Sequence, residues 1–163
     1  MKFTVTQRFH HPAARCAEAF TDPALYPTFA DLPKVGVPEV LSQDTDGATV
    51  RMRVRYRFDG ELNGAARLAV DRAKLTWVDE SVHDLDRQFV TFTLHPDHHA
   101  SQFRGRGTYR FVDTPDGCER IGNIEINISF PLVGRAVEGA IASGLREHLA
   151  DEQGVVERFL DGR

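Results

Sequence analysis

The chain has 163 residues with a formal net charge of −4, and 41% of the residues are hydrophobic while 27% are charged. This composition is typical of a globular protein, the length fits one domain over residues 1–163, and the acidic balance argues against nucleic acid as a partner, because nucleic-acid-binding domains usually carry a basic excess. No apolar run approaches the ~20 residues of a membrane helix and the N-terminus lacks the apolar core of a signal peptide, so we expect a cytoplasmic protein without stable membrane insertion.

The first thirty residues predict a strand and two short helices. Residues 2–9 alternate apolar and polar side chains, which is typical of a half-buried strand. Pro12 and the helical spacing of the apolar residues after it predict a short helix over residues 12–21. Asp22 as N-cap and Pro23 at the first helical position predict a second short helix, whose length Pro27 limits.

Residues 35–130 predict six further strands in hairpin succession. Turn sequences rich in Pro, Asp and Gly occur at 44–47, 95–99 and 114–117. Residues 60–73 break the strand pattern and form either a short helix or an irregular crossing over a sheet edge. The expected strands span residues 35–43, 48–59, 74–84, 87–95, 101–113 and 118–130.

A row of arginines alternates with apolar residues on one of these strands. The row is Arg51, Arg53, Arg55 and Arg57, and the apolar set is Val50, Met52, Val54, Tyr56 and Phe58. The row is either an anion-binding surface or the solvated side of a strand whose apolar side faces the core. We favour the solvated side, because the chain is acidic overall and the next strands carry carboxylates that can form cross-strand ion pairs. The expected partners are Asp79, Glu80, Asp84 and Asp86.

The strongest helix pattern covers residues 132–160. At about 100° per residue its apolar positions fall in one stripe, and charged residues lie outside that stripe. A continuous helix of this length is suited to cover the apolar face of an antiparallel sheet. The stripe consists of Val133, Val137, Ile141, Leu145, Val155 and Phe159.

One strand, two short helices, six strands and a long helix make an α+β chain. This order resembles the helix-grip (SRPBCC) fold of START lipid-transfer domains, polyketide cyclases and the birch-pollen allergen. The segments "FTDPALYPTF" (20–29), "LPKVGVPEVLS" (32–42) and "KLTWVDES" (74–81) resemble an uncharacterised, mainly bacterial branch of that superfamily. The resemblance covers the whole chain and implies a curved seven-stranded antiparallel sheet wrapped on the C-terminal helix, with a cavity between them.

That cavity is the candidate site, and the resemblance implies a small hydrophobic or amphipathic ligand, such as a lipid-, sterol- or polyketide-like molecule. Gly144 lies inside the apolar stripe, where glycine costs about 1 kcal/mol relative to alanine and fills no space. The space over Gly144 and Ala140 holds either a ligand or a bulky sheet residue such as Trp77 or Tyr109. The expected ligand-binding residues are Tyr26, Phe29, Trp77, Phe103, Tyr109, Ile141, Gly144, Leu145 and His148.

Two histidines are candidate polar groups of this site. His148 follows Gly144 by one turn, and Glu152 lies a further turn along the helix. His148 is either a general acid or base or a core-edge histidine satisfied by Glu152, and we favour the second interpretation. His83 is a weaker candidate, because the pattern does not assign the face on which it lies.

Two other functions stay open beside simple ligand binding. An aromatase/cyclase-type enzyme would use acid–base groups of the cavity, and the available groups are His148 with Glu152, His83, Tyr109 and Tyr26. A co-chaperone-like interaction module would instead use the arginine row, so that changing Arg53 and Arg55 to Glu would abolish partner binding. We expect a non-catalytic binding protein and assign no catalytic residue.

Neither a metal nor a cofactor is expected. The "HPDHH" segment offers His95, Asp97, His98 and His99 as ligands, but no other segment has matching Cys/His spacing, and such a segment is more often a turn. Cys16 and Cys118 lie in unrelated segments and are read as buried thiols. The common nucleotide, serine-hydrolase and zinc-protease motifs are absent from the sequence.

Overall fold

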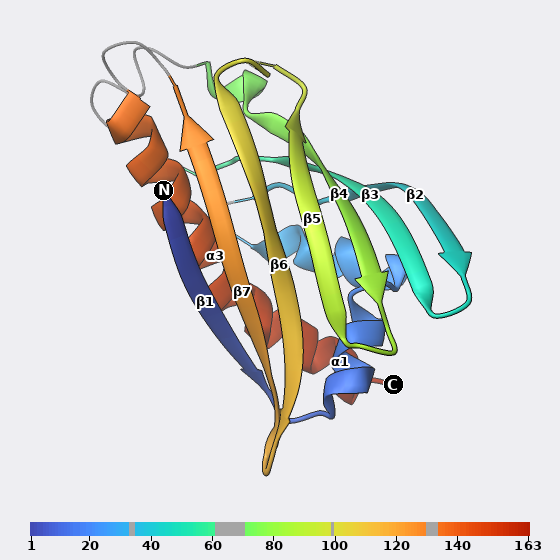
Figure 1. The fold of residues 1–163 in the computed structure, drawn as a ribbon. Coiled ribbons are helices and arrows are strands. Elements are labelled where there is room, and N and C mark those ends of the chain that lie inside the picture. Colours follow the sequence, from blue (N-terminus) through green and yellow to red (C-terminus); the bar gives the residue numbers. More distant parts are fainter. Residues whose placement is uncertain (33–34, 61–70, 99, 130–133) are drawn as a thin grey trace.

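Seven strands form one antiparallel sheet, and a long helix lies across one face of it, in the computed structural model of residues 1–32, 35–60, 71–98, 100–129 and 134–163 (Figure 1). The strands are β1 (Lys2–Phe9), β2 (Glu39–Asp46), β3 (Thr49–Arg57), β4 (Thr76–Asp84), β5 (Phe89–Pro96), β6 (Phe103–Thr114) and β7 (Gly117–Ile128). The helices are α1 (Ala13–Ala19), the 3₁₀ helices η1 (Pro23–Asp31) and η2 (Arg72–Lys74), and α3 (Gly134–Asp161).

The sheet order is β1-β7-β6-β5-β4-β3-β2, so every pair except β1–β7 joins strands that are consecutive in the chain. Each neighbouring pair is antiparallel. The first strand therefore pairs with the last, and α1 and η1 carry the chain from one sheet edge to the other. This is the predicted helix-grip arrangement, with its curved sheet and its two short helices after the first strand.

The expected boundaries are confirmed at most elements and wrong at β2. Only Val35 of residues 35–38 forms a bridge, to Phe58, and the ladder begins at Glu39. Pro38 explains the late start, since proline has no N–H to donate to a ladder. β2 then continues to Asp46, because the tight turn starts at Gly47, whose φ of 58° suits glycine. At the start of η1 the side chain of Asp22 accepts a hydrogen bond from the Ala24 N–H at 2.8 Å, as its predicted N-cap role requires.

The concave face of the sheet carries the core. Val50, Met52 and Val54 of β3 are buried beneath it, together with Ile124 and Ile126 of β7. Leu149, Val155, Val156 and Leu160 of α3 close the core from the other side. Both cysteines are buried and free, as expected. Val133 and the segment 61–70 lie outside the described residues, as do the side chains of Val137 and Ala140.

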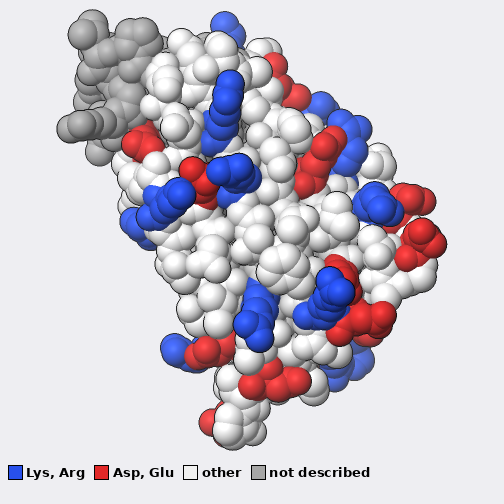
Figure 2. Space-filling view, viewed as in Figure 1, with Lys and Arg blue, Asp and Glu red and all other residues white. Residues whose placement is uncertain are grey.

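The arginine row lies on the outer face of the sheet, where positive and negative side chains are interspersed (Figure 2). Arg53 pairs with Glu80 at 3.0 Å and Arg55 with Asp97 at 3.3 Å. The prediction of a solvated, ion-paired side is confirmed for Glu80. It is wrong for Asp79, which lies opposite Val54 and points to the inner face, since adjacent residues of a strand face opposite sides.

Among the described residues, no helix combines the length and the apolar character needed to cross a lipid bilayer.

Candidate functional site

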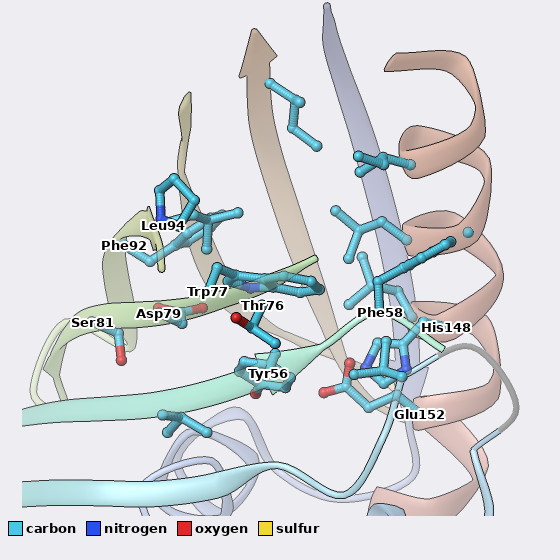
Figure 3. A pocket seen from close by; sticks show the side chains of 18 of the residues that line it. Tyr56, Phe58, Thr76, Trp77, Asp79, Ser81, Phe92, Leu94, His148 and Glu152 are labelled. Carbon is cyan, nitrogen blue, oxygen red and sulfur yellow. The ribbon is translucent and has the colours of Figure 1, made fainter. Parts of the chain in front are cut away.

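A cavity of about 130 Å³ lies between the concave face of the sheet, η1 and α3 (Figure 3). Apolar cavities of about this size, on the order of 150 Å³, hold a benzene ring. All nine residues expected from the sequence line the cavity: Tyr26, Phe29, Trp77, Phe103, Tyr109, Ile141, Gly144, Leu145 and His148. They come from η1, the two strands β4 and β6, and α3, so the fold gathers segments that are distant in the sequence.

Aromatic rings form much of the wall. Tyr56 of β3 and Trp77 of β4 are directly opposite in the sheet register, and their rings stack with centroids 5.8 Å apart. Phe92 and Tyr109 stack at 5.2 Å on the next two strands. Stacked aromatic pairs of this kind offer flat apolar surfaces, which favour a ligand with a ring or another flat apolar part.

One strand departs from this apolar lining. Trp77, Asp79, Ser81 and His83 alternate along β4 and all line the cavity. Figure 3 shows Trp77, Asp79 and Ser81 along the ribbon of β4. Strand β4 thus presents three polar side chains to a mainly apolar space, and His83, whose facing the sequence left open, faces inward.

Asp79 is the most perturbed carboxyl of the site. Burial raises the pKa of Asp79 from 3.8 to about 7; Arg120 opposes this rise and Glu152 adds to it. Its Oδ1 atom is shielded from solvent and has no hydrogen-bond partner among the described residues. A carboxyl with these properties changes its charge close to neutral pH.

His83 is 5% exposed and stays neutral near pH 7, because burial lowers its pKa from 6.5 to about 4. Its Nε2 lies 3.0 Å from the hydroxyl oxygen of Ser81. Its Nδ1 has no partner in the described part of the chain. His83 therefore offers one unsatisfied ring nitrogen that donates or accepts according to its tautomer.

A buried ion pair closes one end of the cavity. Arg120 of β7 and Glu152 of α3 are 7% and 5% exposed, and Arg120 Nη1 donates to Glu152 Oε1 at 3.2 Å. The same nitrogen donates to Gln7 Oε1 at 2.8 Å. The guanidinium carbon lies 3.8 Å from the ring centroid of Phe20 and 3.7 Å from that of Tyr109. The positive charge of Arg120 is thus matched by one carboxylate and held between two rings.

The favoured prediction for His148, a histidine satisfied by Glu152, is wrong. Glu152, its expected partner, is bonded to Arg120 instead, and His148 Nδ1 has no partner among the described atoms. His148 is 5% exposed and packs edge-on against Phe29, with centroids 6.3 Å apart. Burial lowers its pKa, and Glu152 opposes that shift, so the ring favours its neutral form.

Gly144 faces both the cavity and a bulky sheet residue. A Cβ atom at this position would lie 2.8 Å from Cε2 of Phe58, so glycine is needed for the close approach of that ring. Of the two alternatives left open by the sequence, the close approach of a bulky sheet residue is found, and the residue is Phe58 rather than Trp77 or Tyr109. Phe58 follows the last residue of β3, and its ring reaches this turn of α3.

The sequence interpretation missed Asp79 and Arg120 as site residues. A signal was present for both. Asp79 has the same strand parity as Trp77, and Arg120 has the same parity as the inward-facing Ile124. Asp79 and Arg120 were missed because charged residues of a strand are usually exposed to solvent.

The histidine-rich segment is divided between two environments. His95 Nε2 lies 3.1 Å from Glu80 on the outer face, whereas His98 lines the cavity. His99 lies outside the described residues. A separate cluster with metal-ligand geometry lies near the C-terminus and consists of His11, Glu157 and Asp161, where His11 pairs with both carboxylates. Ion pairing accounts for that cluster, so neither group is assigned as a metal centre.

The fold occurs in several solved structures. TTHA0849 from Thermus thermophilus has a TM-score of 0.72 and 17% identity, over 99% of this chain and 98% of that one. Zhui aromatase/cyclase from Streptomyces sp. R1128 has a TM-score of 0.59 and 17% identity, over 97% and 93%. A START superfamily protein from Mycobacterium smegmatis has a TM-score of 0.55 and 17% identity, over 98% and 97%. Comparison with curated proteins gave no match.

These structural similarities show the helix-grip fold. The family is shown by the match of the sequence to a family model. Residues 4–160 match the model of a family described as protein of unknown function, DUF2505. This match spans nearly every element of the sheet and the long helix that covers it. The chain therefore belongs to the DUF2505 family and has the helix-grip fold.

Proposed function

We propose that the protein binds a small amphipathic molecule in the cavity, with an apolar, ring-containing part against the aromatic walls and a polar part toward β4. The observation that carries this proposal is the set of shielded polar atoms without hydrogen-bond partners. Among the described residues these are Asp79 Oδ1, His83 Nδ1, Arg120 Nε and His148 Nδ1.

All four of these residues line the cavity. Buried polar groups are almost always satisfied, and each orphaned atom costs about 1–3 kcal/mol. A cluster of four around one cavity is therefore a set of bonds that an occupant would complete. The apolar walls provide the affinity and the four atoms provide orientation, which is the usual design of a small-molecule site.

Native mass spectrometry of protein purified from its own host tests the proposal. We expect a non-covalently bound mass that is lost on denaturation. Ser81→Phe fills the cavity and should abolish that mass. Val82→Phe is the matched control, because Val82 is the adjacent residue, is exposed on the outer face and does not line the cavity. Thermal unfolding checks that both variants fold.

The proposal fails if the wild-type protein carries no bound mass and binds none of a panel of fatty acids, sterols, aromatic polyketides and small ring-containing amines, alcohols and acids. It also fails if Ser81→Phe, in a folded state, binds the same mass as the wild type. The second outcome would place the ligand outside the cavity.

A second candidate function is acid–base catalysis on the bound molecule, and Asp79 is the observation that favours it. A carboxyl with a pKa of about 7 is suited to both accept and donate protons at neutral pH. The co-purified molecule, incubated with fresh enzyme, would then change mass or retention time with wild type but not with Asp79→Asn. An unchanged molecule would leave binding as the function.

The arginine row does not favour the interaction-module alternative. Arg53 and Arg55 already have carboxylate partners, and Arg57 pairs with Asp59 at 2.9 Å. These pairs neutralise most of the positive charge that an acidic partner would recognise.

A further inference from the structure

Building on the proposed function, we propose that the polar part of the ligand is a protonated amine, received by the Asp79 carboxylate beside Trp77. The ligand class is a small arylalkyl or alkyl amine. The inference rests on the charges of the cavity, on the unpartnered oxygen of Asp79 and on the aromatic rings around it.

Asp79 is the acidic group of the cavity that has no ion-pair partner among the described residues. Arg120 and Glu152 form a direct pair and cancel each other. His83 and His148 favour their neutral forms because both are buried. The ionised form of Asp79 is thus left without an ion-pair partner in the described lining, because Arg120, whose charge lowers the pKa of Asp79, is already paired with Glu152. A carboxylate in this position is stabilised most by a ligand that brings a positive charge and an N–H donor.

An anionic ligand fits the same space poorly. It would have to approach Arg120, whose charge is already paired with Glu152 and whose Nη1 donates to Gln7 and Glu152, so that Nε–H is its only shielded donor without a partner among the described residues. It would also be repelled by the charges of Glu152 and Asp79. These two carboxylates lie near enough to each other that the charge of Glu152 raises the pKa of Asp79. Like charges at close range in a poorly solvated site cost several kcal/mol.

The aromatic surroundings of Asp79 suit an organic cation. Trp77 lies two residues before Asp79 on the same face of β4, about 6.6 Å along the strand. Tyr56 stacks on Trp77 from β3, and both rings line the cavity. A ring face next to a carboxylate attracts an ammonium group by cation–π and ionic contacts together.

The phenols near Asp79 keep their charge state between pH 5.5 and 8. Burial raises the pKa of Tyr26, Tyr56 and Tyr109, so these phenols stay neutral. Lys74 and His98 line the cavity but are exposed to solvent, where screening weakens their effect. Amine binding should therefore follow the ionisation of Asp79: strong at pH 8, weaker as the pH falls through 7, and accompanied by proton release near pH 6.

Isothermal titration calorimetry with three matched probes tests the inference. The probes 2-phenylethylamine, 2-phenylethanol and 3-phenylpropionate share a ring and a short chain and differ in the charge of the polar group. At pH 8 we expect the amine to bind at least tenfold more tightly than the alcohol, and the carboxylate to bind most weakly. At pH 5.5 the advantage of the amine over the alcohol should shrink at least tenfold.

Asp79→Asn and Glu80→Gln form a matched pair of variants. Asp79→Asn should weaken amine binding at least tenfold and leave alcohol binding within threefold. Glu80→Gln removes the same charge from the next residue, which points to the outer face, and should leave both affinities within twofold. If Asp79→Asn fails to fold, the pH series on the wild-type protein still decides the question.

Equal affinities for the amine and the alcohol at pH 8 would overturn the amine inference while leaving a cavity that binds small molecules. Tightest binding of the carboxylate would overturn it in favour of an anion held by Arg120. Binding of none of the three probes would overturn it as well, and the bound mass from native mass spectrometry would show separately whether the proposed function stands.

Discussion

Asp79 and Glu80 are adjacent carboxylates of β4 in opposite environments. Glu80 lies on the outer face with Arg53 and His95 as partners, whereas Asp79 lines the cavity with an oxygen that has none among the described residues. The outer face of the sheet is a set of exposed, exchangeable ion pairs, and the inner face holds a few buried polar groups that are incompletely satisfied. The comparison teaches that adjacent carboxylates of one strand can have opposite environments, ion-paired in solvent on one face and incompletely satisfied in the cavity on the other.

The largest expected effect of a substitution is at the buried ion pair. Arg120→Met leaves Glu152 buried without a partner and should lower the free energy of unfolding by about 3–5 kcal/mol. Urea denaturation at pH 7 measures it. The double variant Arg120→Met/Glu152→Gln should recover part of the loss, because it removes the uncompensated charge. A loss of unfolding free energy below about 1 kcal/mol for Arg120→Met alone would mean that the buried Arg120–Glu152 pair contributes no more than an exposed ion pair.

The pH dependence of stability separates Asp79 from its outer neighbour. The unfolded carboxyl ionises near pH 4 while the folded one ionises near pH 7, so ligand-free wild type loses stability from this group as the pH rises between those values. Asp79→Asn lacks that loss and should gain about 2–4 kcal/mol over wild type between pH 4 and pH 8. Denaturation series at several pH values measure the difference, and Glu80→Gln should show no such gain. Parallel profiles for wild type and Asp79→Asn would contradict the raised pKa.

Two glycines of α3 sharpen the comparison between inside and outside. Gly144→Ala forces a Cβ against Phe58 and should destabilise by about 1–2 kcal/mol in spite of the better helix propensity of alanine. Gly139 is exposed, with no atom within 4 Å of an added Cβ, so Gly139→Ala should stabilise by about 0.5–1 kcal/mol. Thermal unfolding of both variants checks this opposition. Equal shifts for the two variants would show that the Phe58 ring moves aside freely.

The smallest effect is expected on the outer face. Arg53→Ala removes an exposed pair with Glu80 and should change the free energy of unfolding by less than about 1 kcal/mol. The change should shrink further in about 0.5 M salt, which screens exposed charges. A loss comparable to that of Arg120→Met would show that the outer row is a structural network rather than a solvated surface.

Much of the fold follows from local patterns. The alternation in β3 placed Val50, Met52 and Val54 inside and Arg53 outside, and the structure has them so. The helix pattern of residues 132–160 nearly coincides with α3 (Gly134–Asp161). These patterns succeed because burial of one side of a strand or helix repeats with the period of that element.

The candidate site was predictable where its residues are apolar or aromatic, and less so where they are charged. All nine expected residues line the cavity, yet Asp79 was assigned to the outer ion pairs and Arg120 was not considered. Both have inward parity, but a charged residue on an inner face needs a partner or a function, and its partner is not visible in the local sequence. For Arg120 that partner is 32 residues away, in α3.

By itself the sequence determined the elements, the side of each strand that faces the core and the apolar stripe of the long helix, because these depend on near neighbours in the chain. Only the tertiary structure decided that Arg120 pairs with Glu152, that Phe58 lies against Gly144 and that Asp79 is left with an oxygen unpartnered by any described residue in the cavity. These contacts join distant segments, and they depend on the order and curvature of the sheet, which set the distances between side chains that the sequence only assigns to a face.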